Sequence, residues 1–214
     1  MSLQKHITIA AFFVFSVVFF VSNAKAEMVE ISITATVNYL LDTKNYLEGK
    51  VHINDIITGS YKYESATPDS SLSDPTQGNY WHYSTPAGIS LAVGGFNFTT
   101  NPDNVNFLIS IGNNCPGDVY LVRSNNNLPL SGSAGVGGIS WQLDDYTATA
   151  LSSDALPVTA PILSQWQDKT LNIDGGGIGG SFAIGAEVTS AQLVPEPATF
   201  LLFAVGTMFL RKRL

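Results

Sequence analysis

Residues 29–37 read VEISITATV, and this stretch decides the fold that the sequence predicts. Apolar side chains occupy every odd position from Val29 to Val37, while Glu30 and three hydroxyl-bearing residues occupy the even positions. Successive side chains of a β-strand point to opposite faces of a sheet, so a period of two places all the apolar residues on one face. The stretch therefore predicts a half-buried strand with its apolar face against a core.

The chain on the C-terminal side of this stretch has the same character as far as residue 193. Further strands are expected at 46–53, 57–63, 89–93, 96–99, 105–111, 119–123, 138–143, 171–173 and 182–193. Gly94-Gly95 is expected to form a two-residue hairpin turn, and 161–167 is the one candidate for a short helix. Roughly nine to eleven short strands separated by turn residues predict an all-β fold, an antiparallel β-sandwich of the jelly-roll type.

The N-terminal segment is of a different kind. Lys5 precedes an apolar run over residues 7–21, and the small residues Ala24 and Ala26 follow it. This order is typical of a secretory signal peptide over residues 1–26, cleaved before Glu27. The alternative is an uncleaved anchor helix, but a spanning helix needs about 20 apolar residues and this run is shorter.

The C-terminal segment 194–214 reads VPEPATFLLFAVGTMFLRKRL. Proline fixes φ and has no amide donor, so Pro195 and Pro197 are expected to keep the start of the segment extended. The apolar run 198–210 would make a helix about 20 Å long at ~1.5 Å per residue, and its basic end would stay on the cytoplasmic side. The alternative, a helix of the core, is disfavoured because the run has no polar face.

Val194-Pro195-Glu196-Pro197-Ala198, followed by an apolar run and the basic residues Arg211, Lys212 and Arg213, resembles the PEP-CTERM sorting signal. The resemblance implies recognition by exosortase, a membrane-embedded cysteine transpeptidase-like enzyme of the Gram-negative inner membrane. It also implies transient anchoring there and a final place at the cell surface or in an extracellular matrix that contains exopolysaccharide. Residues 59–70 and 149–161 resemble segments of other PEP-CTERM proteins, whose bodies look like all-β export cargo.

Charge agrees with this route and excludes several partners. The chain has a net charge of −7, and the body between the two signals, residues 27–193, has five basic and sixteen acidic residues, a net charge of −11. So acidic a body is not expected to bind nucleic acid or an anionic membrane surface. Lys5 and the basic C-terminal cluster would both stay inside, which places the body outside the inner membrane.

Motifs that suggest chemistry have simpler interpretations. Residues 175–180 satisfy G-x-G-x-x-G, but a strand pattern follows them instead of a helix, so a glycine hairpin is expected. Asp144, Asp145 and Asp174 are the best carboxylate candidates, and a role in turns is expected because no calcium-loop spacing is present. Cys115 is the one cysteine, so it cannot form a disulfide within the chain, and an isolated loop thiol is expected. We expect no catalytic residues, metal or cofactor.

Two functions are left open for the body by the aromatic run Tyr80-Trp81-His82-Tyr83 with Trp141 and Trp166, of which Trp81 and Trp141 are the candidate carbohydrate contacts. Aromatic rings exposed on a β-sheet can stack on sugar rings, whereas buried ones fill the core. The sequence therefore predicts an exported, non-catalytic surface or matrix protein, with a carbohydrate-binding module for the host's exopolysaccharide as the alternative. A polysaccharide-degrading enzyme is the third reading, since glycosidase carboxylates can lie far apart in sequence.

Overall fold

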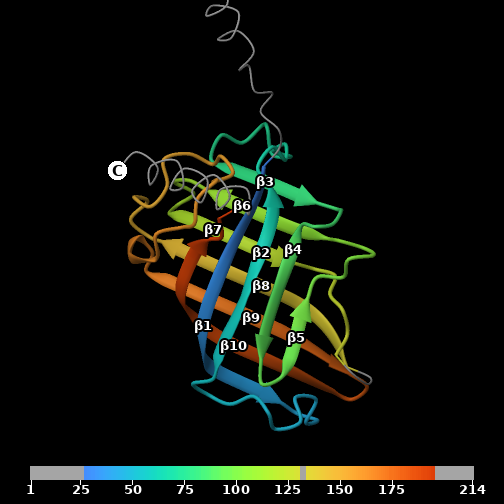
Figure 1. The fold of residues 1–214 in the computed structure, drawn as a ribbon. Coiled ribbons are helices and arrows are strands. Elements are labelled where there is room, and N and C mark those ends of the chain that lie inside the picture. The colour runs from blue at the N-terminus through green and yellow to red at the C-terminus, as the bar shows by residue number, and fades with distance from the viewer. Residues whose placement is uncertain (1–26, 131–133, 196–214) are drawn as a thin grey trace, which may run out of the picture.

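The computed structural model describes residues 27–130 and 134–195, which form an all-β body (Figure 1). The described elements are β1 (Met28–Asp42), β2 (Ile56–Glu64), β3 (Gln77–His82), β4 (Gly88–Val93), β5 (Phe96–Thr99), β6 (Phe107–Gly112), β7 (Asp118–Ser124), β8 (Gly135–Asp145), the 3-10 turn η1 (Leu163–Gln165), β9 (Asp168–Gly177) and β10 (Gly180–Leu193). Neighbouring strands all pair antiparallel. The all-β, antiparallel prediction is confirmed for these residues.

Strand β1 has the alternation that its sequence predicts. Its odd residues from Val29 to Val37 are at most 3% exposed, while the even ones between them are partly exposed. The strand is hydrogen-bonded on both sides, to β2 and to β10. It therefore lies inside the sheet, with one face on the core.

The ten strands form one continuous sheet in the order β3-β6-β7-β8-β9-β10-β1-β2-β4-β5. In Figure 1 the strands β1, β2, β4 and β5 run across the front, and β3 and β6–β9 cross behind them at a steep angle. The β1–β10 ladder joins these two layers and has register shifts at Thr34/Ala35 and Val37/Tyr39. Such irregularities bend and twist a strand. The body is thus a curled sheet with two facing layers, which differs from the two separate sheets of a jelly roll.

Aromatic side chains fill the space between the layers. The Tyr61 hydroxyl on β2 lies 2.8 Å from the Tyr120 hydroxyl on β7, and the Tyr61 ring centroid lies 5.5 Å from that of Trp141 on β8. Phe98 on β5 and Phe182 on β10 meet in the same way, with centroids 6.2 Å apart. These contacts connect the two layers through one core.

Three local predictions need correction or refinement. Residues 46–53 form turns instead of a strand, with left-handed backbone at Glu48 and Gly49 (φ 51° and 62°), which no strand can contain. Strand β3 was not predicted. The short helix expected over 161–167 is the single turn η1.

Both ends of the described chain lie at the same end of the β1–β10 ladder. Ile31 pairs with Leu193, and the Val194 amide donates to the Glu30 carbonyl at 2.8 Å. The predicted signal peptide over 1–26 and the tail from Glu196 onward, including the expected flanking helices, lie outside the described residues. Within residues 27–130 and 134–195, no helix is long and apolar enough to cross a membrane.

Candidate functional site

Trp81 and Tyr83 form a pair of parallel rings on the outer face of the sheet. Buried and partly exposed residues alternate along β3, which places Trp81 outward beside the buried His82. The side chain of Tyr83, just past the strand, is 69% exposed. The two ring centroids are 6.1 Å apart and the ring planes differ by 5°. Their arrangement is that of a small aromatic platform.

Trp141 has the opposite environment. It is 0% exposed and packs between Tyr61 and Tyr120, with ring centroids 5.5 and 5.8 Å away. A ligand on the surface cannot reach it. As a candidate carbohydrate contact Trp141 is therefore wrong, and the alternative, that it fills the core, holds for this residue.

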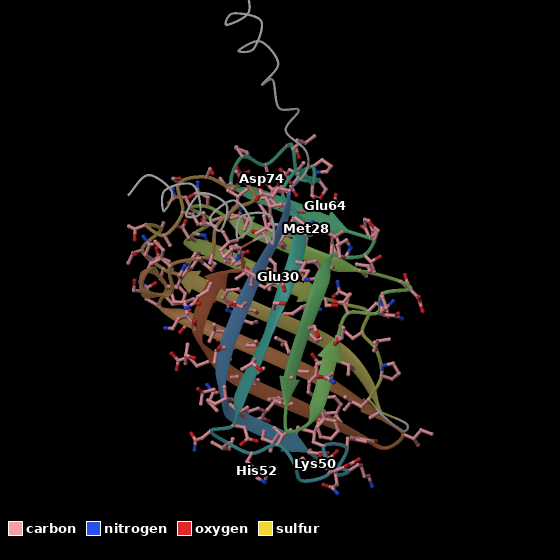
Figure 2. The ribbon with its side chains drawn as sticks, in the orientation of Figure 1. Met28, Glu30, Lys50, His52, Glu64 and Asp74 are labelled. Atoms are coloured by element: carbon pink, nitrogen blue, oxygen red, sulfur yellow. The ribbon has the colours of Figure 1, made fainter. Side chains whose placement is uncertain are left out.

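The platform borders a hollow of about 210 Å³, which we call the aromatic hollow. One side of the hollow is formed by the end of β2 and the loop after it, and the other side by β3 and the residues that follow it. Figure 2 labels Glu64 near β3, at the end of β2. The residues that matter to its chemistry are Glu64, Thr67, Trp81, His82, Tyr83 and Ser84.

The loop between β2 and β3 is fixed against the outer edge of β3. The Ser70 amide donates to the Asn79 carbonyl at 2.9 Å, and the Asn79 amide donates to Asp69 Oδ1 at 2.7 Å. Asp69 Oδ1 also accepts the amide of Ser71 at 2.8 Å. These bonds satisfy an edge strand that would otherwise present unpaired backbone groups. They also give the aromatic hollow a defined wall.

His82 lies beneath the platform as a neutral, satisfied side chain. Its Nδ1 is 3.2 Å from the Tyr80 carbonyl, which can only accept, so Nδ1 carries the proton. Nε2 then accepts the Thr67 hydroxyl at 2.9 Å. Burial lowers the pKa of His82 below its ordinary value, because the charged form loses hydration. The hydroxyl of Thr67 is thereby oriented, and its oxygen keeps capacity to accept.

The carboxylate candidates hold turns. Asp145 is buried and accepts the amides of Thr147, Thr149 and Ala150 at 2.7–2.9 Å, and these bonds, with the Thr147 hydroxyl, hold its pKa well below the usual range. The expected turn role is confirmed for Asp145. Asp118, its cross-strand neighbour on β7, accepts the amides of Asn114 and Leu151.

The other two carboxylate candidates do not join Asp145 in a site. Asp144 accepts the side-chain amide of Gln142 at 2.8 Å on the opposite face of β8. Asp174 lies on β9 opposite Gly138, toward the other end of the strands. The described part of the chain has no group of three His, Cys, Asp or Glu side chains that could hold a metal ion.

Two further motifs lie in loops. Residues 175–180 form the hairpin between β9 and β10, and Ser181 continues as strand, so the hairpin prediction is confirmed. Cys115 is exposed in the turn between β6 and β7. Of the predicted sorting motif only Val194, 37% exposed, and Pro195 are described.

Comparison of the chain with protein-family models, with curated proteins and with solved structures finds no match. The geometry described above therefore carries the functional argument. Glu64 and Thr67 are residues of the aromatic hollow that the sequence does not mark as candidates. Tyr83 belongs to the aromatic run 80–83, and it follows Trp81 at the two-residue spacing that puts side chains on one face of a strand.

Proposed function

We propose that the chain is an exported, non-catalytic protein of the cell surface or extracellular matrix, delivered through a PEP-CTERM tail and processed by exosortase. The observation that carries the proposal is where the folded body ends. Its last strand stops at Leu193, Val194 makes a last backbone bond to Glu30, and the exposed Pro195 follows. The sorting motif thus starts at the point where the chain stops pairing with the sheet.

The positions of the two ends support the same route. The antiparallel β1–β10 ladder brings residue 28 and residue 193 to one end of the sheet. Segments leaving the body from that end can meet one membrane, with the rest of the body on its outer side. This fits the topology that Lys5 and the basic cluster at 211–213 imply.

The tail would act by tethering. Proline at positions 195 and 197 keeps the cleavage segment free of backbone pairing and open to an enzyme. An apolar helix over 198–210 would hold that segment at the membrane surface, which raises its effective concentration for a membrane-embedded enzyme. Signal peptidase and exosortase are then the partners during export.

The test is to change Pro195, Glu196 and Pro197 together to Ala in a host that has exosortase. The full-length triple variant is expected to accumulate in the inner membrane. Pro75→Ala, in an exposed loop of the body, is the control and should be released like the unchanged protein. Release of the triple variant at the control's level would contradict the role of the motif.

A carbohydrate-binding module for the host's exopolysaccharide is the second candidate function, and the exposed pair of Trp81 and Tyr83 favours it. A glycosidase would typically need two carboxyl groups facing each other across a groove, about 5–9.5 Å apart. Asp118 and Asp145 are instead buried and bonded to backbone amides. The geometry therefore favours binding over hydrolysis.

A further inference from the structure

We propose that the aromatic hollow binds one ring of a neutral glycan, with the sugar packed against the exposed ring surface of the Trp81–Tyr83 pair and its hydroxyls bonded to the rim. The proposal concerns what the body binds, and it does not depend on the route by which the body is exported. A negative result in the export test would therefore leave this proposal standing, and a negative result in the binding test would leave the export proposal standing.

The platform supplies the first part of the argument. The two rings are stacked with planes that differ by 5°, and Tyr83 is 69% exposed, so apolar ring surface of the pair meets solvent and suits the C–H face of a pyranose. Trp81 and Tyr83 are held there by the strand, since residues two apart lie on the same face. The backbone bonds between Asn79 and the 69–71 loop keep that strand in place, so the platform is formed before any ligand arrives.

The rim supplies the second part, because its groups mostly accept hydrogen bonds. The lining includes Glu64, whose carboxylate can only accept, and the Thr67 hydroxyl already donates its proton to His82, so its oxygen is left to accept. Ser84 can donate or accept. Acceptors around an aromatic surface match a ligand that is rich in hydroxyl donors, and a sugar ring is such a ligand.

Charge argues against an anionic glycan. None of the body's five basic residues lines the hollow, and the body has a net charge of −11. An anionic polysaccharide would meet repulsion without a compensating cation. A neutral polysaccharide chain does not meet this repulsion and needs no cation in the hollow.

Size and position decide how much of the glycan is held. The hollow of about 210 Å³ is smaller than the ~300–1,000 Å³ typical of pockets that enclose a whole drug-sized ligand. It suits a single ring of a longer chain. Strand β3 lies at the edge of the sheet, so a polymer can pass across the platform at the rim of the molecule.

The experiment is affinity electrophoresis of residues 27–195, which contain every strand and core residue described. The gels contain a neutral glucan, galactan, mannan or xylan, with alginate as the anionic probe and chitosan as the cationic one. We expect retardation by at least one neutral polysaccharide and none by alginate. Trp81→Ala and Tyr83→Ala should each weaken that binding roughly tenfold.

Tyr146→Ala is the matched control, because Tyr146 is also 69% exposed but lies outside the hollow. It should bind like the unchanged body. If Trp81→Ala fails to fold, Trp81→Phe keeps an aromatic face and should retain part of the affinity. The glycan should also protect the fluorescence of Trp81 from iodide, since Trp141 and Trp166 are already buried.

Three results would overturn the proposal. They are no retardation by any neutral polysaccharide, retardation by alginate or chitosan alone, and neutral-glycan binding that both alanine variants keep. Self-association that depends on Trp81, without glycan binding, would instead identify the hollow as a contact between proteins, since aromatic residues are also enriched at such interfaces.

Discussion

At the scale of single residues, the environment of a side chain decides its role. Trp81 and Trp141 carry the same ring, but Trp81 stacks on Tyr83 at the surface while Trp141 lies in contact with two buried tyrosines. Asp145 is an acid whose oxygens serve only to hold the turn that follows β8. His82 is a base kept neutral by burial. Each contributes to the fold through contacts that can be tested singly.

Trp141→Ala should lower the free energy of unfolding of the body by about 3–5 kcal/mol, because it leaves a large cavity in a closed core. Trp81→Ala should cost much less, since its ring already meets solvent on one side. Chemical denaturation followed by circular dichroism measures both. Equal losses for the two variants would contradict the placement of Trp81 on the surface.

Asp145 should make stability fall in acid. Its folded pKa lies below the unfolded value of about 3.9, so folding favours the ionised carboxylate and its stabilisation is complete above that value. It is lost as pH falls from about 4 toward the folded pKa. Melting temperatures of the unchanged body and of Asp145→Asn should therefore differ most at pH 6–7 and converge in strong acid. A constant difference across this range would contradict the assigned cause.

At the scale of elements, alternation predicted the strands that have one apolar face. β1 and the strands from β6 onward were predicted from it, because a half-buried strand must alternate. Strand β3 was missed because its inward positions are Gly78, Tyr80 and His82, which do not form an apolar row. Residues 46–53 were assigned wrongly because the buried Leu47 and Val51 resemble strand positions, while left-handed residues at Glu48 and Gly49 turn the chain.

The candidate site could be predicted only in part. Trp81 was found within the aromatic run 80–83, but its companions Glu64 and Thr67 reach it only through the crossing of β2 and β3. Such a meeting depends on topology and has no local signal in the sequence. For Trp141 the signal existed, because Ile139, Trp141 and Leu143 alternate as an inward row of β8.

The β4–β5 hairpin offers a matched pair of substitutions. Gly94 and Gly95 both have left-handed backbone (φ 58° and 82°), so alanine at either should cost about 1–2 kcal/mol. A Cβ at Gly94 would also lie 2.5 Å from the Lys50 carbonyl oxygen, whereas one at Gly95 meets open space. Gly94→Ala should therefore melt at a lower temperature than Gly95→Ala. The reverse order in thermal unfolding would contradict the packing of the 43–55 loop on this hairpin.

At the scale of the whole molecule, the described body is a single folded unit, and we propose that the segments on either side of it direct its export and sorting. Its core lies between the two layers of one curled sheet, and its two ends leave from the same end of the β1–β10 ladder. A strongly acidic surface keeps such a body soluble. We therefore expect the body to fold independently of the segments that we propose direct its export.

The body expressed as residues 27–195 should therefore fold without the N-terminal segment 1–26 and without the C-terminal tail. Its far-ultraviolet circular dichroism should be dominated by β-structure, with helix far below the roughly one third of ordinary proteins. The full-length chain in detergent should show added helix if the flanking segments are helical. A disordered or helix-rich spectrum of the body alone would contradict its independence.

The central claim is that the C-terminal tail is an address removed on delivery, and the most direct test is the C-terminus of the released protein. Intact-mass and peptide mass spectrometry should be applied to the form collected from the surface of a host that has exosortase. We predict a chain that begins at Glu27 and ends, or is linked to another group, at or near residues 194–198. A released protein that still carries Arg211, Lys212 and Arg213 would contradict the account.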